Sequence, residues 1–391
     1  MNKLINIIKG GISDSFHVWR AELDHTFKDL GVVIFFIVVP LIYPVLYGLI
    51  YNPEVVRKVP VVVVDQSQTS SSRSFVRKLG ATADVAVIAH CPEMEEAKRL
   101  VDKKEAYGIL LIPSEFSRQL HTGQKATIQL FCDMGSMLHY KAILMASTEA
   151  SMNLGREIHI LTEAIPYESI SLYNTQSGFS SFLLPAILVL VIQQTLLLGV
   201  GMLAGTSRER TRSGLLIPSG KQYRGTLRVV FGKAMAYLLI YAYVAIWTLL
   251  IVPHIFELPQ IAPYGNTLLF SLPYLLACIF FAMSLSFIIK SRETPMLVFV
   301  FTSVPLVFLS GVSWPVSAIP VFWKWVSYLF PSTFGVQGYV KLNSMGAKLS
   351  EISFEYKMLW ILTGVYFVIT CILYRWQVHK ADKKRLEKSN F

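Results

Sequence analysis

The sequence predicts an α-helical polytopic membrane protein with six transmembrane helices and an inserted α/β domain outside the cytoplasm. Three observations support this prediction. Hydrophobic residues make up 53% of the 391 residues and charged residues only 16%, whereas soluble domains average about 25% charged residues. Long stretches without any charge recur along the chain. Positive charge, finally, gathers on one side of the predicted membrane. This balance excludes a disordered chain and argues against an ordinary soluble enzyme.

Six segments are long and apolar enough, or nearly so, to cross a membrane. A helix needs about 20 mostly apolar residues to span ~30 Å of hydrocarbon. The predicted spans lie within residues 31–51, 180–205, 234–253, 258–289, 295–323 and 358–374. The fifth segment is longer than one crossing requires, so its second half is expected to turn back or to lie at the interface. The last segment is only just long enough.

Charge sets the predicted orientation. With both termini in the cytoplasm, the inner segments are residues 1–30, 206–233, 290–293 and 375–391, and they carry the entire net charge of +11. This asymmetry follows the positive-inside rule. Anionic membrane lipid is therefore the expected partner of these basic segments, and no nucleic acid is expected.

The polar insert, residues 52–177, shows alternating strand and helix patterns that predict a small α/β domain. Strands are expected at 61–64, 83–89, 106–112 and 127–131, and helices at 70–79, at 93–103 and from Ser114. A helical pattern from about 136 to 165 leads back to the membrane.

The first strand ends at a polar turn that contains Asp65, Ser67, Ser70, Ser71 and Ser72. Such a turn could supply a nucleophile, bind phosphate, or cap the following helix through one of the serines. The turn has no glycine to bring its backbone close to a phosphate, so the cap is the better interpretation.

Two cysteines of the insert, Cys91 and Cys132, raise a second question. They could form a disulfide in an oxidising compartment, or they could bind a metal together with His90 and Asp133. Two unpaired thiols are the default expectation, with no metal or cofactor.

No Asp, Glu, Lys or Arg lies near the middle of any predicted span, which argues against an ion-coupled carrier because coupling needs ionisable groups. The polar residues at depth either form hydrogen bonds between helices or line a substrate path. These residues are Gln193, Gln194, Thr195, Ser284, Ser286, Thr302 and Ser303.

The inner segments offer two candidate contact surfaces. The cluster Arg208-Glu209-Arg210 with Arg212 follows the second span. The nearby Gly220-Lys221 does not fit a phosphate-binding loop, because Gln222 stands where Ser or Thr must ligate magnesium. Before the first span, one helical face carries the apolar residues of an interfacial helix. They are Phe16, Leu23, Phe27 and Leu30.

Several motifs resemble those of a known family. In the insert these are Pro60–Asp65 and Gly108–Pro113, the latter followed by Glu115-Phe116-Ser117. Near the C-terminus they are Leu309-Ser310-Gly311, Trp314-Pro315, Ile319-Pro320 and Phe330-Pro331-Ser332-Thr333. Together the residues resemble an ABC-2-type transporter permease of the exporter branch, over almost the whole chain.

The resemblance implies the ABC-2 permease fold. Its expected parts are an N-terminal connecting helix (1–30), a first transmembrane helix (31–51), an extracytoplasmic domain (52–177) and a core of five helices (178–375), followed by a basic tail (376–391). The core would contain a cytoplasmic coupling loop (206–233) and an extracytoplasmic re-entrant segment (314–335).

The resemblance also implies a function and partners. The chain would be the membrane subunit of an ATP-binding-cassette exporter in the bacterial inner membrane, with a separate ATPase subunit, a second permease chain (identical or paralogous) and a periplasmic membrane-fusion adaptor. It would move an amphipathic or apolar drug or lipid, as in multidrug efflux, and would not itself be an enzyme. The alternative is a membrane-anchored receptor or sensor that binds an external ligand.

Three sets of site residues follow from this interpretation. The ATPase-coupling set is Arg208, Glu209, Arg210 and Arg212. The substrate-path set is Gln193, Gln194, Thr302 and Ser303. The extracytoplasmic-gate set is Trp314, Pro315 and Pro331.

Overall fold

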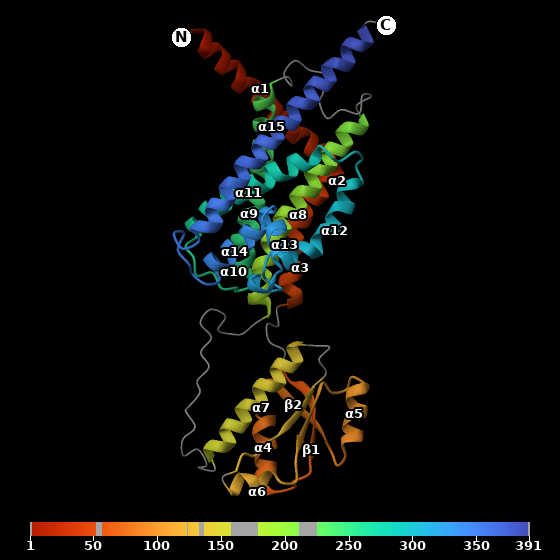
Figure 1. Ribbon diagram of the computed structural model, residues 1–391, viewed down its shortest axis with the longest axis vertical. Helices are drawn as coiled ribbons and strands as arrows, with labels where there is room; N and C mark the ends of the chain where they lie inside the picture. Colours follow the sequence, from red (N-terminus) through yellow and green to blue (C-terminus); the bar gives the residue numbers. More distant parts are fainter. Residues whose placement is uncertain are drawn as a thin grey trace. The chain divides into compact units, whose positions relative to one another are not determined.

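Figure 1 shows a computed structural model of the protein, which describes residues 2–51, 57–122, 124–132, 137–157, 179–210 and 225–389. The chain divides into two compact units. One comprises residues 53–171, and the other comprises residues 1–52 together with 172–391. The sequence predicts this boundary at residues 52 and 177.

The second unit is entirely helical where it is described. Its α-helices are α1 (Asn2–Lys28), α2 (Leu30–Val33), α3 (Val39–Tyr51), α8 (Phe179–Arg210), α9 (Thr226–Ile246), α10 (Val252–Ile255), α11 (Tyr264–Ser286), α12 (Thr294–Leu309), α13 (Val321–Ser327), α14 (Pro331–Asn343) and α15 (Ser353–Ser389). Figure 1 shows that α1 and the C-terminal part of α15 emerge at the same end of this unit, which we call the inner end.

Five of the six predicted spans are confirmed as long apolar helices. Among the described residues, Leu30–Tyr51, Ser180–Arg210, Thr226–Ile255, Tyr264–Ser286 and Ser353–Lys380 are long enough to cross a membrane. The remaining helix, α12, has 16 residues and covers only about 24 Å. It ends just before Gly311, whose φ of 86° is the left-handed conformation that stops a helix. A sixth crossing stays a prediction.

Two spans contain a short π-helical segment, Ile34–Val38 and Trp247–Ile251. Each ends two residues before a proline, Pro40 or Pro253. A proline has no N–H to donate to the carbonyl four residues earlier, so the helix must adjust there. The Leu249 carbonyl, which Pro253 leaves without this partner, accepts a hydrogen bond of 2.9 Å from the Tyr339 hydroxyl of α14.

Helix α8 forms the centre of the helical unit, with 83% of its most apolar window buried. It packs against α3, α11, α12 and α14. Its 32 residues extend about 48 Å, well beyond the hydrocarbon. Residues 206–210 and 226–233 of the predicted coupling loop are helical, because α8 continues to Arg210 and α9 begins at Thr226. The coupling role of this segment stays a prediction. The predicted basic tail likewise continues α15 as far as Ser389.

The first unit contains a four-stranded sheet in the order β2-β1-β3-β4, from β1 (Val59–Asp65), β2 (Val85–Cys91), β3 (Gly108–Ile112) and β4 (Gln129–Cys132). β1 is parallel to β2 and β3, and β4 is antiparallel to β3. The helices are α4 (Ser70–Gly80), α5 (Met94–Asp102), α6 (Phe116–His121) and α7 (Met137–Glu157). The predicted order of strands and helices is confirmed.

Both faces of the central strand β1 are covered, as expected for a parallel strand. Val61 and Val63 join the core under α4 and α7, whereas Val62 and Val64 join a smaller core under α5. All four valines are fully buried. This explains why the sequence shows a continuous apolar run here and not an alternation.

The sheet topology excludes a disulfide between Cys91 and Cys132. Cys91 lies on the edge strand β2 and Cys132 on the opposite edge strand β4, so three strand spacings, or about 14 Å, separate the two edges. Disulfides need Cα atoms within about 7 Å. Both cysteines are free thiols, and the same separation prevents His90 and Cys91 from sharing a metal ion with Cys132.

The half-buried thiol of Cys132 should react slowly with alkylating reagents at neutral pH. Burial raises the pKa of this thiol to about 11, and only the thiolate is nucleophilic. The rate at which iodoacetamide labels Cys132, measured by mass spectrometry from pH 7 to pH 10, should still be rising with pH at pH 10. The labelling rate of a cysteine introduced at the exposed Lys125 should level off at lower pH, above the ordinary thiol pKa of about 8.5. Equal profiles for the two sites would contradict this.

Candidate coupling surface and transport path

Helix α1 lies along α9 at the inner end of the helical unit. Asp14 Oδ2 is 2.6 Å from Arg228 Nη1, and Glu22 Oε2 is 2.9 Å from Lys233 Nζ. The Tyr237 hydroxyl also donates to Glu22. The side chain of Glu22 is only 8% exposed, so this carboxylate is held inside the interface between the two helices.

Three of the four apolar residues predicted to face the membrane interface are exposed, whereas the fourth, Leu23, is partly buried and packs against the core of the helical unit. Phe16 and Phe27 are exposed, as is Leu30 just beyond the end of α1. The residues buried against the unit are Val18, Glu22 and Thr26, which follow one another at helical spacing. Contact of these exposed residues with lipid stays a prediction, while the opposite face attaches α1 to α9.

Asp29 lies at the break between α1 and α2 and has four partners. Its Oδ1 caps α2 by accepting hydrogen bonds from the backbone N–H groups of Gly31 (3.1 Å) and Val32 (3.3 Å). Arg292 Nη2 lies 2.5 Å from Oδ1, and the Thr206 hydroxyl donates to Oδ2 at 3.3 Å. This carboxylate therefore connects α2, α8 and the segment that precedes α12.

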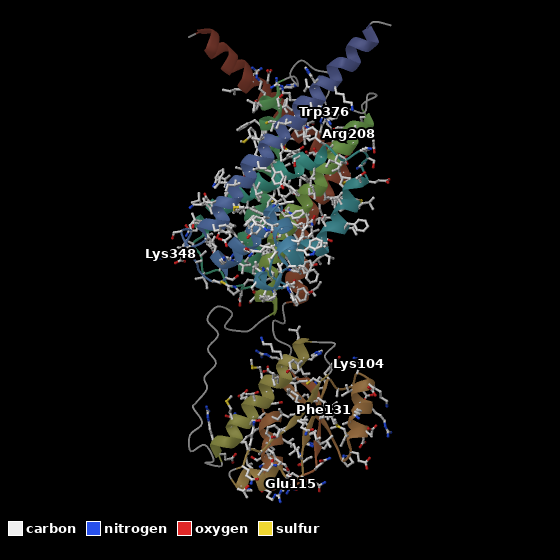
Figure 2. The ribbon with its side chains drawn as sticks, in the orientation of Figure 1. Lys104, Glu115, Phe131, Arg208, Lys348 and Trp376 are labelled. Carbon is white, nitrogen blue, oxygen red and sulfur yellow. The ribbon has the colours of Figure 1, made fainter. Side chains whose placement is uncertain are left out.

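The predicted coupling residues have different environments. Arg208 donates through Nη2 to the carbonyl of Phe287, just after α11. Glu209 Oε1 accepts from the backbone N–H of Arg292 at 2.9 Å. Arg210 is exposed at the end of α8, and Arg212 lies outside the described residues. Figure 2 shows Arg208 near the inner end, where Trp376 of α15 is also labelled.

The predicted substrate-path residues are brought together only in part. Gln194 Nε2 lies 3.4 Å from Thr302 Oγ1, which connects α8 to α12. Gln193 is buried and its Oε1 accepts from the backbone N–H of Ser332 at 2.6 Å, at the start of α14. Ser303 donates to its own helix, to the Val300 carbonyl.

Three polar atoms of this region are buried without a hydrogen-bond partner among the described residues: Gln193 Nε2, Gln194 Oε1 and Ser332 Oγ. Buried polar groups of this kind normally find a partner. The centre of the helical unit therefore has unused hydrogen-bonding capacity beside α8 and α14.

Residues of α12, of α13 and of the segment between these helices line an apolar pocket of about 310 Å³. Its lining residues are Pro305, Phe308, Leu309, Trp314, Ile319, Pro320 and Trp323. The Trp314 indole N–H points to the Ala318 carbonyl at 3.3 Å. Of the other predicted gate residues, Pro315 is exposed beside Trp314, whereas Pro331 is buried where α14 begins. The gate residues thus lie in two different environments.

In the α/β unit, the polar turn after β1 is a helix cap, as predicted, but the capping residue is different. Thr69 caps α4 by accepting from the backbone N–H of Ser72, and Ser72 Oγ accepts from the N–H of Thr69. The Ser72 hydroxyl also donates to Asp65 at 2.6 Å. The pattern Thr-x-x-Ser is a variant of the capping box, which sequence reasoning missed by considering only the serines.

Sequence reasoning also missed the ion pairs of α1. It treated Asp14, Glu22 and Asp29 as polar residues around an interfacial helix, although their basic partners lie in α9 and just before α12. One sequence signal could have indicated these ion pairs: an acidic residue recurs every one or two turns in the helix that precedes the first span.

The comparison with known families agrees with this geometry. The family described as "ABC-2 family transporter protein" matches residues 31–372, which includes every confirmed span wholly or in large part. No curated protein matches the chain. With its apolar membrane-spanning helices, the chain therefore belongs to the ABC-2 family of transporter proteins and is an integral membrane permease of that family.

Proposed function

We propose that this permease is the membrane subunit of an exporter driven by a separate ATPase subunit. The observation that carries the proposal is the set of ion pairs that attaches α1 to the inner ends of the membrane helices. A partner that moves α1 would move these helices with it. The energy for the transition would come from a ligand that binds the two conformations of the complex differently, and ATP on the partner would be this ligand.

The proposed cargo is amphipathic or apolar, such as a drug or a lipid. The described membrane helices carry no charged residue near their middle, so nothing there would compensate a charged substrate. The pocket at Trp314 is lined by rings and alkyl groups. A 150 Å³ cavity is enough for benzene, so about 310 Å³ would accept a ring system roughly twice that size.

The further parts of the proposal concern the assembly. A second permease chain, identical or paralogous, would complete the path, and a periplasmic adaptor would take the cargo from residues 52–177. Both termini would lie in the cytoplasm of a bacterium. The positive charge of the inner segments supports this orientation. The receptor alternative gains no support from the family match.

Charge reversal at the inner end tests the ATPase contact. Arg210→Glu should lower the amount of ATPase that co-purifies with the permease several-fold, because Arg210 is exposed at the end of α8. Lys348→Glu is the matched control, since Lys348 is exposed far from Arg208 (Figure 2). Quantitative mass spectrometry of the purified complex gives the readout. Unchanged association in Arg210→Glu, or equal loss in both variants, would count against this surface.

Transport itself separates the exporter from the receptor. Proteoliposomes that contain the permease and its co-purified ATPase should accumulate a fluorescent apolar dye only when ATP is present. A receptor would show no ATP-dependent accumulation under any of these conditions.

A further inference from the structure

The loop between α11 and α12, residues 287–293, is held by side chains from two other parts of the helical unit. Asp29 binds the guanidinium of Arg292, Glu209 binds the backbone N–H of Arg292, and Arg208 binds the carbonyl of Phe287. The first residue of the loop, Phe287, is therefore attached to α8, and Arg292 near its other end is attached both to α8 and to the start of α2.

Two glycines allow the loop to approach the helices closely. A Cβ at Gly205 of α8 would lie 2.6 Å from the Ser291 carbonyl oxygen and 2.7 Å from the backbone N and Cα of Arg292. A Cβ at Gly31 of α2 would lie 2.6 Å from Arg292 Nη2. The loop thus rests on helix backbone at Gly205, where no flexible side chain separates them. Such a contact transmits displacement because packed interiors have low compressibility.

Asp29 is the single residue that separates α1 from α2. It is 8% exposed and fixes α2 by capping its first turn. Any displacement of α1 therefore reaches Asp29 directly, and through Arg292 it reaches the first turn of α12. Without Arg292, α1 would still be attached to α9 through Glu22 and Lys233, but the start of α12 would lose its link to Asp29.

The ion pair itself contributes little to stability. The Arg292 side chain is 43% exposed, and ion pairs that are open to solvent contribute little to stability. The pair is therefore better suited to setting a position than to holding the fold together.

We propose that Asp29 and Arg292 transmit the movement of α1 to α8 and α12, with Arg292 as a positioning residue for transport. This inference rests on the proposed function, because it assumes that the ATPase acts on α1. It assigns Arg208 and Glu209 to holding the 287–293 loop, and it leaves the ATPase contact to Arg210.

The link can be tested on the permease alone. Spin labels are placed at Phe16→Cys in α1 and Leu297→Cys in α12, both exposed positions, after the native cysteines have been removed. Pulsed electron resonance in lipid nanodiscs should give a single narrow distance distribution. Arg292→Gln should broaden it, because α12 no longer follows α1.

Matched variants separate positioning from folding. Asp29→Asn should broaden the distribution as much as Arg292→Gln, since Asn still caps α2 but has no charge for the guanidinium. The double variant should be no broader than either single variant, as expected for two partners in one interaction. Arg292→Lys should restore most of the narrow distribution, and Lys290→Gln, an exposed charge in the same loop, should leave it unchanged. An unchanged distribution in Arg292→Gln would overturn the inference.

Activity provides the second readout. In proteoliposomes with the co-purified ATPase, Arg292→Gln should hydrolyse ATP at a rate close to that of the unsubstituted complex but move several-fold less dye for each ATP. Equal transport per ATP in the two complexes would refute the inference while leaving the proposed function intact. Absence of ATP-dependent transport in the unsubstituted complex would instead refute the proposed function, and the spin-label result would then stand as a purely mechanical link.

Discussion

Replacing Glu22 with alanine is expected to destabilise the helical unit by about 3 kcal/mol, because removing one partner of a buried ion pair leaves the other uncompensated. Lys233 would lose its counter-charge, and the buried Tyr237 hydroxyl would lose its acceptor. Lys233 is 23% exposed and can turn toward water, which keeps the loss at the low end of the range. Alanine is the best helix former, so the loss cannot come from helix propensity.

Unfolding in mixed micelles of a mild detergent and SDS, followed by helical circular dichroism, measures this loss. Asp24→Ala is the control on the same helix. The pair of Asp24 with Lys28 is exposed on both sides, so its removal should leave the stability almost unchanged. Combining Glu22→Met, Lys233→Met and Tyr237→Phe removes the whole network and should recover most of the stability. A loss in Asp24→Ala equal to that in Glu22→Ala would contradict this account.

The confirmed part of the fold is the part that local signals determine. A run such as residues 234–253 is apolar and uncharged whatever it packs against, and Val61 to Val64 is a strand in any context that buries both its faces. Helix ends are set less locally. The sequence placed the start of the coupling loop at residue 206, but Arg208 and Glu209 continue α8 because the 287–293 loop provides partners for both side chains.

The candidate site could be predicted only at the level of regions. Glu22 and Lys233 are 211 residues apart in the chain, and no periodicity relates two residues at that distance. For Gln193, the sequence indicates where the residue lies but not which neighbour its side chain contacts. It is buried inside the helical unit, but the direction of its side chain depends on α14, which places the Ser332 nitrogen 2.6 Å from Gln193 Oε1. Its predicted contact with substrate stays a prediction.

Gly199→Ala is expected to destabilise the helical unit, although alanine normally stabilises a helix relative to glycine by about 0.5–1 kcal/mol. Gly199 lies in α8 against the first span, and a Cβ there would lie 1.6 Å from Cδ2 of Phe36. Phe36 is fully buried and makes edge contacts with Tyr237 and Tyr241, so its ring has little room to move. The expected loss is at the upper end of the ~1–3 kcal/mol that overpacking costs.

Gly364→Ala is the matched control, because a Cβ at Gly364 of α15 meets nothing within 4 Å. This variant should gain a fraction of a kcal/mol, so the same chemical change should have opposite signs at the two sites. Phe36→Leu makes room beside α8 and should lower the additional cost of Gly199→Ala, as contacting residues are not additive. If Gly199→Ala and Gly364→Ala shift the SDS midpoint in the same direction, then the first span does not pack on α8 at Gly199.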